Sequence, residues 1–181
     1  MSKAELRPAM RAARKAYVAS LSPAERRQQE AGFAVHLQSL LNRAKIVGAY
    51  HPHGSEIDPR GALDGMTVAY PGFTADEEKF SYRTGTCAET GPHGIMQPAL
   101  SNPTLLPDLL LIPLIGIGPA GYRLGQGGGH YDRVLPDLKE AGAILIGVGW
   151  DMQRLDFPLP HEPWDVPLDG FASPSGLEMF R

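Results

Sequence analysis

The sequence lacks a second cysteine and a long apolar run, and each absence excludes a class of protein. Because Cys87 is the single cysteine among 181 residues, the chain cannot form the internal disulfides that are common in small secreted domains. The longest apolar run, 109–117, contains Pro113 and Gly116 and is much shorter than the roughly 18 residues of a membrane span. The basic start, 1–14, lacks the apolar stretch of a secretory signal. We therefore expect a reduced, cytoplasmic protein with an inert thiol and no membrane partner.

The sequence also lacks a large excess of charge of either sign. Its formal net charge of −3 excludes the strongly basic balance that is typical of nucleic-acid-binding proteins. The first 15 residues are nevertheless basic, with five cationic side chains against the single acid Glu5: Lys3, Arg7, Arg11, Arg14 and Lys15. A local basic face suits a small polyanion, although on the residues alone such a row is more often a solvated helix face.

Helical and strand patterns alternate along the chain. Ser22 and Glu25 form the capping-box pattern of a helix that ends near Leu41, and 130–141 predicts another. The first predicted helix, Lys3–Ser20, has an apolar stripe at helical spacing: Leu6, Met10, Ala13 and Tyr17. Strands are expected at 46–50, 67–70 (ending before Pro71), 79–83, 108–117, 143–150 and, at a sheet edge, 168–172.

The two most apolar strands, 109–114 and 144–148, are hydrophobic on both faces. Strands of this kind belong to sheets that are covered by helices on both sides. The sequence contains no internal repeat, low-complexity tract or linker. We therefore predict an α/β fold with an open, mainly parallel sheet in a single domain over residues 1–181.

The segment 121–133, GYRLGQGGGHYDR, carries most of the chemical information. It follows the most apolar strand and opens a helix, so its glycines expose backbone N–H groups beside a helix N-terminus, as phosphate sites do. Arg123 adds a permanent positive charge, and Asp132 is well placed to hold a divalent cation. The segment fits neither the Walker A motif nor the dinucleotide fingerprint, and a bare Gly-rich turn more often solves only a steric problem.

The full string Gly121-x-Arg-Leu-Gly-x-Gly-x-Gly-His-Tyr-Asp132 resembles the signature of the 5-formyltetrahydrofolate cyclo-ligase family. Three other segments resemble that family in order and spacing, so that the resemblance covers nearly the whole chain. Lys3-x-x-Leu-Arg7 is similar to its N-terminal ATP-contacting helix, Tyr50-x-Pro with Ser55-Glu-Ile-Asp58 to its folate-contacting loop, and Asp165-x-Pro-Leu-Asp169 to its final acidic element.

The resemblance implies the three-layer α/β fold that this family shares with ribose-5-phosphate isomerases and CoA transferases. It implies an enzyme that uses ATP, with Mg²⁺, to convert 5-formyltetrahydrofolate into 5,10-methenyltetrahydrofolate, ADP and phosphate. In the family mechanism the formyl oxygen takes the γ-phosphoryl group, and N10 then attacks the activated carbon. We expect a monomer whose ligands are a reduced folate and ATP, with neither nucleic acid nor membrane as a partner.

The resemblance also implies roles for individual residues. Arg123 and Lys3 would be catalytic, because phosphoryl transfer chiefly needs positioning and charge neutralisation. Mg²⁺ would be held by Asp132 and Asp165. The expected ATP contacts are Lys3, Arg7, Arg123, Leu124, Gly125, Gln126, Gly127, Gly128, Gly129, His130 and Tyr131. The expected folate contacts are Arg7, His51, Glu56, Gln126, Gly127, Gly128, Gly129 and His130.

Two departures from the family pattern keep alternatives open. Where the family usually has Phe-Asp, this chain has Ile117-Gly118, so one acidic group near the site is missing. The residue before Tyr131 is usually Tyr or Phe and here is His130, which can still stack on a flat ring but titrates near neutral pH. The alternatives are an ATP-using enzyme of the same fold with another small-molecule substrate, and a non-catalytic nucleotide-binding module.

Several further residues have structural interpretations on the sequence alone. Asp58 before Pro59 is expected to cap a short helix. The histidines without ligand-like spacing are expected at the surface: His36, His93 and His161. Trp150 and Trp164 are expected in the core or the wall of the site, with Trp164, next to Asp165, the better candidate for the wall.

Overall fold

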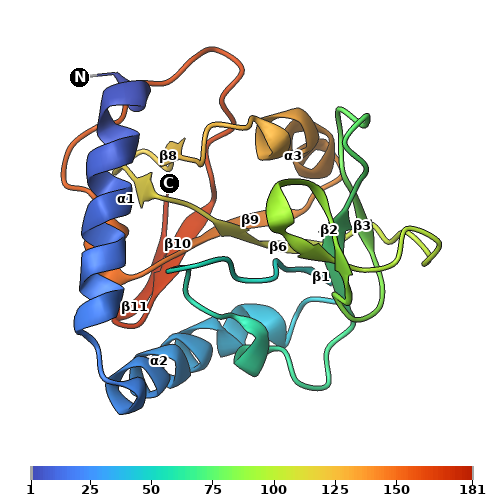
Figure 1. Cartoon of the computed structure of the whole chain (residues 1–181), viewed down its shortest axis with the longest axis horizontal. Coiled ribbons are helices and arrows are strands. Elements are labelled where there is room, and N and C mark those ends of the chain that lie inside the picture. The colour runs from blue at the N-terminus through green and yellow to red at the C-terminus, as the bar shows by residue number, and fades with distance from the viewer. Residues whose placement is uncertain (1, 181) are drawn as a thin grey trace.

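The computed structural model describes residues 2–180, which build a seven-stranded sheet flanked by helices (Figure 1). The order across the sheet is β11-β10-β9-β6-β1-β2-β3. The strands are β1 (Val47–Gly48), β2 (Val68–Gly72), β3 (Ser81–Arg83), β6 (Leu109–Pro113), β9 (Ile144–Val148), β10 (Gly170–Ser173) and β11 (Gly176–Met179). The five central strands run parallel, and only β3 and β11 pair antiparallel at the edges. The predicted open, mainly parallel sheet is confirmed.

Three α-helices and three short 3-10 helices accompany the sheet in the described part of the chain. They are α1 (Lys3–Ser20), α2 (Pro23–Leu41), α3 (His130–Glu140), η1 (Arg60–Ala62), η2 (Pro92–Gly94) and η3 (Asp151–Gln153). Ser2 and Ser22 each accept the backbone N–H three residues ahead, and Glu5 and Glu25 complete the two capping boxes. These caps satisfy N–H groups that a helix start would otherwise leave unpaired. The boundaries predicted for α1 and α2 are therefore confirmed.

The sheet separates two hydrophobic cores, which gives the molecule three layers. Along β6, Leu109 and Leu111 join the core beneath α2, whereas Leu110 and Ile112 join the core beneath α3. Successive side chains of a strand point to opposite faces, and Figure 1 shows α2 and α3 on opposite sides of the sheet. Burying each such side chain stabilises the fold by about 1.5–3 kcal/mol. A strand that is apolar on both faces is stable only in this three-layer arrangement.

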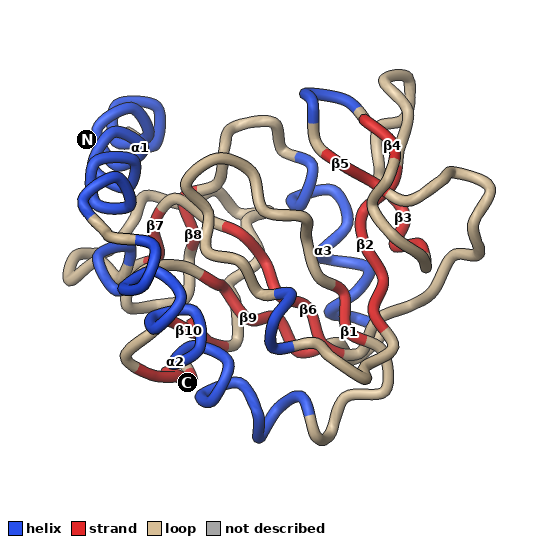
Figure 2. The backbone as a smooth tube through the Cα atoms, turned by 60° about the horizontal axis from the view of Figure 1, so that its bottom comes forward, coloured by secondary structure: helices blue, strands red, loops and turns tan. Residues whose placement is uncertain are grey.

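Helix α1 lies outside these three layers, beside one end of the sheet (Figures 1 and 2). Leu6 packs with Ile115 and Leu124 in a third, smaller core. The predicted apolar stripe is wrong at one position, because Ala13 is exposed and the neighbouring Arg14 is buried instead. The reason is reach: a methyl group is too short to contact the body of the protein here, whereas the long Arg14 side chain hydrogen-bonds to it.

Three predictions about the strands are wrong. Strand β2 continues through Pro71, because β1 ends at Gly48 and no strand on that side needs the missing N–H. The segment 108–117 divides into β6 and β7 (Gly116–Ile117), and the Gly-rich segment that follows contains β8 (Arg123–Leu124), which pairs with β7. The expected edge strand, β10, is covered by β11 and is therefore not at the edge.

Two further short strands, β4 (Glu89–Thr90) and β5 (Met96–Gln97), form a hairpin with η2 at its tip. In Figure 2 this hairpin stands above β2, on the same side of the molecule as α3. Among the residues that the structure describes, none of the helices combines the length and the hydrophobicity that crossing a bilayer requires.

Candidate active site

A cavity of about 960 Å³ opens at the carboxyl ends of the parallel strands. Tyr50 after β1, Phe73 after β2 and Pro113 at the end of β6 form part of its wall. Small-molecule sites typically occupy roughly 300–1,000 Å³, so this cavity is at the large end of that range. Its described lining includes six cationic side chains against two carboxylates: Lys3, Arg7, Arg11, Arg14, Lys15 and Arg123 against Glu56 and Asp132. This balance favours anionic ligands.

The basic row of α1 fastens the Gly-rich loop from one side. Arg7 Nε donates to the carbonyl oxygen of Gly125 at 3.0 Å. Arg11 Nη2 donates to the backbone and side-chain oxygens of Gln126 at 3.2 and 3.1 Å. Because Leu6 and Met10 tie the same helix to the third core, α1 holds the loop at a defined position. The interpretation of this row as a merely solvated face is wrong.

The loop's glycines serve different purposes. Gly127 and Gly129 have φ angles of +103° and +68°, which side chains rarely adopt. A Cβ on Gly128 would lie 2.9 Å from the His130 ring, whereas a Cβ on Gly125 would meet no atom within 4 Å. The space above Gly125 is therefore open to a ligand. At the end of the loop, α3 begins at His130 and presents its first, unpaired N–H groups.

Leu124 is the one loop residue of the predicted set whose side chain does not line the described cavity. Its side chain is fully buried with Leu6 and Ile115. A ligand in the cavity would therefore meet at most the main chain of Leu124. The leucine instead anchors the loop to α1.

The two acids expected to bind a metal each pair with a cation expected to contact ATP. Arg123 forms an ion pair with Asp132, and its Nη1 donates to the carbonyl oxygen of Val166 at 3.3 Å. Lys3 forms an ion pair with Asp165, the neighbour of Val166. Arg123 therefore contacts Asp132 directly and its positive charge acts on Asp165, although Asp165 does not itself line the cavity.

The charged form of Asp165 is favoured. Burial raises the pKa of this carboxyl, but hydrogen bonds from Lys3 and from the backbone of Glu162, with the positive charges of Lys3 and Arg123, together lower the pKa below its ordinary value. Within residues 2–180, no group of three or more His, Cys, Asp or Glu side chains is placed to hold a metal ion. Any metal on Asp132 or Asp165 would need further oxygen ligands, such as phosphates and water.

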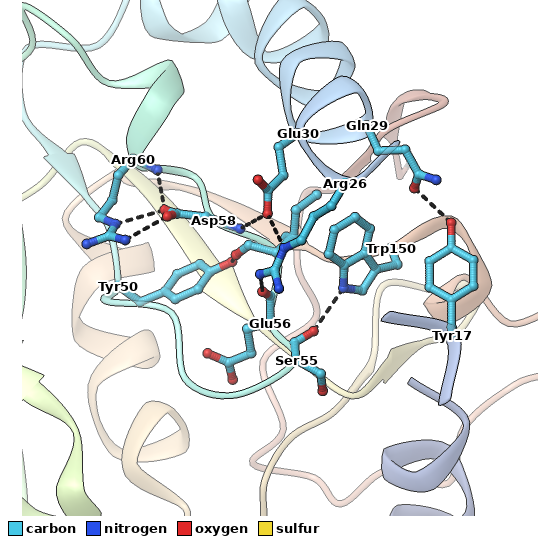
Figure 3. A network of polar contacts seen from close by, with 11 residues as sticks. Tyr17, Arg26, Gln29, Glu30, Tyr50, Ser55, Glu56, Asp58, Arg60 and Trp150 are labelled. Carbon is cyan, nitrogen blue, oxygen red and sulfur yellow. Dashed lines mark hydrogen bonds and ion pairs between the residues drawn. The ribbon is translucent and has the colours of Figure 1, made fainter. Parts of the chain in front are cut away.

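The loop after β1 is fixed from behind, which leaves Glu56 facing the cavity (Figure 3). Trp150 Nε1 donates to the Ser55 carbonyl oxygen at 2.9 Å, and Tyr50 Oη donates to that of Ile57 at 2.7 Å. Arg26 Nη2 on α2 donates to the backbone oxygen of Glu56 at 3.2 Å. The Glu56 carboxylate accepts the His53 N–H at 2.9 Å, and it accepts Gln126 Nε2 of the Gly-rich loop at 3.3 Å.

Burial raises the pKa of Glu56, against the opposing effects of the His53 N–H and the positive charge of Arg14. Arg14 is only 4% exposed. Its guanidinium donates to Ser55 Oγ at 3.0 Å and to the carbonyl oxygen of Leu114 at 3.1 Å. Sequence reasoning missed this role for Arg14. The regular spacing of Arg7, Arg11 and Arg14 was visible, but not the buried carboxylate that the third arginine faces.

His51 lines the cavity, and its Nε2 lies 3.1 Å from Arg60 Nη1. Burial and the positive charge of Arg60 lower the pKa of His51. Asp58 binds Arg60 and also accepts its backbone N–H at 3.0 Å, at the first residue of η1. The N-cap position of η1 is Pro59, so the predicted place of Asp58 as the cap is wrong by one residue, although its carboxylate accepts this first N–H.

His130 stands at the rim of the cavity against Phe73, with ring centroids 5.0 Å apart. His93 also lines the cavity, and its Nε2 lies 3.3 Å from His130 Nε2. His93 is exposed, so its expected place at the surface is confirmed, and the contact with His130 adds to it. Burial, His93 and the positive charge of Arg133 lower the pKa of His130.

Of the two tryptophan predictions, one is confirmed and one is wrong. Trp150 is fully buried in the core beneath α2, as expected. Trp164 is 67% exposed and does not line the cavity, so its assignment to the wall was wrong. It lies in a turn-rich segment whose ordered contacts come from its neighbour Asp165 instead.

The missing acid at Gly118 has a steric explanation. A Cβ there would lie 3.2 Å from the backbone of both Phe157 and Leu159, so the segment 157–159 occupies the room that an aspartate would need. Ile117 before it is fully buried.

Cys87 is half-buried, and burial raises the pKa of its thiol to about 11. Since the thiolate is the reactive form, this thiol is unreactive at neutral pH.

Comparisons with known proteins agree across the chain. The profile of the 5-formyltetrahydrofolate cyclo-ligase family matches residues 1–174. The 5-formyltetrahydrofolate cyclo-ligase of Haemophilus influenzae is 30% identical over 83% of this chain and 88% of that protein, and the one from Mycolicibacterium smegmatis is 34% identical over 79% and 82%. The NMR structure of Aquifex aeolicus 5,10-methenyltetrahydrofolate synthetase superposes with a TM-score of 0.81 at 27% identity, covering 100% of this chain and 94% of that one.

Proposed function

The chain belongs to the 5-formyltetrahydrofolate cyclo-ligase family, and from that premise we propose how its cavity carries out the reaction. The enzyme uses ATP to cyclise 5-formyltetrahydrofolate to 5,10-methenyltetrahydrofolate, with release of ADP and phosphate. The observation that supports the cavity as the site is the junction of its two loops. Gln126, from the Gly-rich loop, contacts Glu56, from the loop after β1, so ligands on the two loops would lie side by side.

In this proposal the triphosphate of ATP lies along the Gly-rich loop. The open space above Gly125 and the N–H groups at the start of α3 suit phosphate oxygens. The side chains proposed for ATP are Lys3, Arg7, Arg123, Gln126, His130 and Tyr131, with the main chain of Leu124, Gly125, Gly127, Gly128 and Gly129. Lys3 and Arg123 exchange their carboxylate partners for phosphate oxygens when ATP enters.

The folate is proposed to bind on the Glu56 side of the cavity. A carboxylate offers two acceptors in one plane, which matches the paired N–H groups of a pterin edge. Burial behind Glu56 removes competing water, so each hydrogen bond to its charged form is stronger than at the surface. His51, Arg7 and His130 complete this side, together with Gln126 and the backbone of 127–129.

The proposed reaction has two steps. The formyl oxygen first attacks the γ-phosphorus, and the bond to ADP breaks. N10 then attacks the formyl carbon, its proton leaves, and the phosphorylated oxygen departs as inorganic phosphate. Arg123 and Lys3 act by offsetting the negative charge that moves between the oxygens during the first step, which is the main requirement of phosphoryl transfer.

The residues beside Arg123 suit Mg²⁺, which we propose as the metal. Asp132 and Asp165 are hard oxygen donors, and both flank Arg123 at the proposed phosphate site. Mg²⁺ is usually held by one or two carboxylates with substrate phosphates and water, so two acids without a third fit this ion. When bound, it would supply charge neutralisation on the phosphates.

Replacing Asp132 with asparagine is expected to raise the Mg²⁺ concentration for half-maximal activity by about tenfold or more, as loss of a metal-supporting group commonly does. The matched control is Asp137→Asn on the same helix, where the carboxylate is exposed and pairs with Lys79. Activity is measured against Mg²⁺ at fixed ATP. An unchanged Mg²⁺ requirement in Asp132→Asn would move the metal role to another acid.

The activity itself is tested by mixing the purified chain with 5-formyltetrahydrofolate and Mg-ATP and following absorbance of the conjugated methenyl product. We expect a rise that needs the protein, ATP and Mg²⁺ together. No rise with intact ATP binding would favour an enzyme of this fold with another substrate, an alternative suggested by the absent acid at Gly118.

We further propose that residues 1–181 act as one monomeric, cytoplasmic catalytic domain.

A further inference from the structure

Two histidines from distant parts of the chain meet at the rim of the cavity. His93 belongs to η2, at the tip of the β4–β5 hairpin, and His130 is the first residue of α3. Their Nε2 atoms are 3.3 Å apart. Within residues 2–180, His93 is the only residue other than glycine with a positive φ angle, +60°. Such a conformation costs free energy and is held by its surroundings, often at functional positions.

The separation of the two nitrogens matches the ligand spacing of a tetrahedral metal ion. With metal–nitrogen bonds of about 2.0–2.1 Å, two ligands of a tetrahedral Zn²⁺ lie about 3.3–3.4 Å apart. The two imidazoles therefore already have the required separation. Imidazole nitrogen is a ligand for Zn²⁺, Cu²⁺ and Ni²⁺, whereas Mg²⁺ prefers oxygen. The pair thus selects a different ion from the one proposed on Asp132 and Asp165.

The surroundings limit how this ion would be held. His130 packs against Phe73, with ring centroids 5.0 Å apart, and its ring lies beside Gly128. Because no third His, Cys, Asp or Glu in the described chain is placed to join the pair, water would fill the other positions. Arg133, which donates to the Gly128 oxygen at 3.3 Å, adds a nearby positive charge that weakens binding.

We propose that His93 and His130 bind one transition-metal ion of the zinc class, and that this ion inhibits the enzyme by fastening η2 to α3 across the rim of the cavity. The metal-binding part of this proposal rests on the two histidine side chains alone. Its inhibitory effect rests on the proposed function of the cavity, because both histidines line it. The ion would be a regulator, separate from the metal that assists the reaction.

Metal binding is tested by titrating the metal-free full chain with Zn²⁺ against a chromophoric chelator. We expect one equivalent bound by the wild type and by His161→Asn, whose histidine stacks on Tyr122 instead. His93→Asn should lose that equivalent, since asparagine tolerates the left-handed backbone but lacks the imidazole. Circular dichroism without zinc checks that this variant is folded. Equal Zn²⁺ binding by wild type and His93→Asn would overturn the site.

Inhibition is tested separately, at fixed Mg-ATP and folate with increasing free Zn²⁺. We expect wild-type activity to fall at least tenfold more steeply than that of His93→Asn, and a zinc-selective chelator to restore it. The variant also controls for zinc complexed by ATP, which affects both proteins equally. Equal inhibition of both would overturn the regulatory role. A chain without cyclo-ligase activity would fail the proposed function, whereas the Zn²⁺ titration would still decide the site.

Discussion

Replacing Gly125 with valine is expected to lower cyclo-ligase activity by about a hundredfold or more without lowering the unfolding temperature. A Cβ at this position meets no protein atom within 4 Å, so the folded chain can accept the side chain. The same space is where we propose that the triphosphate lies. Displacing reacting groups by about 1 Å can cost a hundredfold in rate, and a valine side chain would displace the phosphates by at least that much.

The matched control is Gly61→Val, since a Cβ on Gly61 also meets nothing within 4 Å and Gly61 does not line the cavity. Gly125→Ala should give an intermediate loss. Gly128 is a poorer target, because its Cβ would push against the His130 ring. Activity, ATP affinity by calorimetry and thermal unfolding are measured for each variant. If Gly125→Val binds ATP as tightly as the wild type, the triphosphate does not lie on this loop.

Replacing Glu56 with glutamine is expected to lower kcat/KM for the folate about a hundredfold, while the KM for ATP changes little. Hydrogen bonds to a charged group contribute about 1.5–3 kcal/mol each. Losing the charge from two such bonds costs about 3 kcal/mol, which corresponds to a factor of about a hundred. Glutamine retains an oxygen that can accept the His53 N–H, so the loop should keep its shape.

Asp58→Asn is the matched control, because that carboxylate lies in the same loop but binds Arg60. A pH profile gives an independent test. Burial raises the pKa of Glu56, so in the wild type kcat/KM for the folate should fall as pH decreases through that raised pKa, when the carboxylate becomes protonated. This acidic limb should be absent in Glu56→Gln. The same limb in both proteins would assign it to a different group.

Local patterns in the sequence predicted much of the fold. The capping box of Ser22 and Glu25 involves residues three positions apart, so neighbours along the chain suffice to place the start of α2, and the apolar stripe from Leu6 suffices to predict α1. Strand β6 is apolar on both faces, which requires a helix layer on each side whatever the rest of the chain does. These local signals are sufficient to predict the mainly parallel sheet and its helices.

The same reasoning was wrong where a residue's environment comes from far along the chain. Ala13 fits the helical stripe of α1, yet Arg14 is buried because Ser55 and Leu114 supply its acceptors. Trp164 is apolar but exposed. Strand β10 was predicted at the edge of the sheet, but β11 pairs with it there. Periodicity describes which residues share a face, not what that face meets.

The candidate site also has one part that the sequence predicted and one part that depends on the tertiary structure. The sequence alone identified the loop that we propose for phosphate, from the glycine spacing between Gly125 and Gly129 and from the family resemblance. Glycine residues show directly where the backbone has no side-chain cover. Only the tertiary structure joined Gln126 to Glu56, 70 positions apart, and His93 to His130, 37 positions apart. Such pairs form because packing the sheet and its loops brings distant segments to one rim of the cavity. A pattern of neighbouring residues does not determine which distant segments meet.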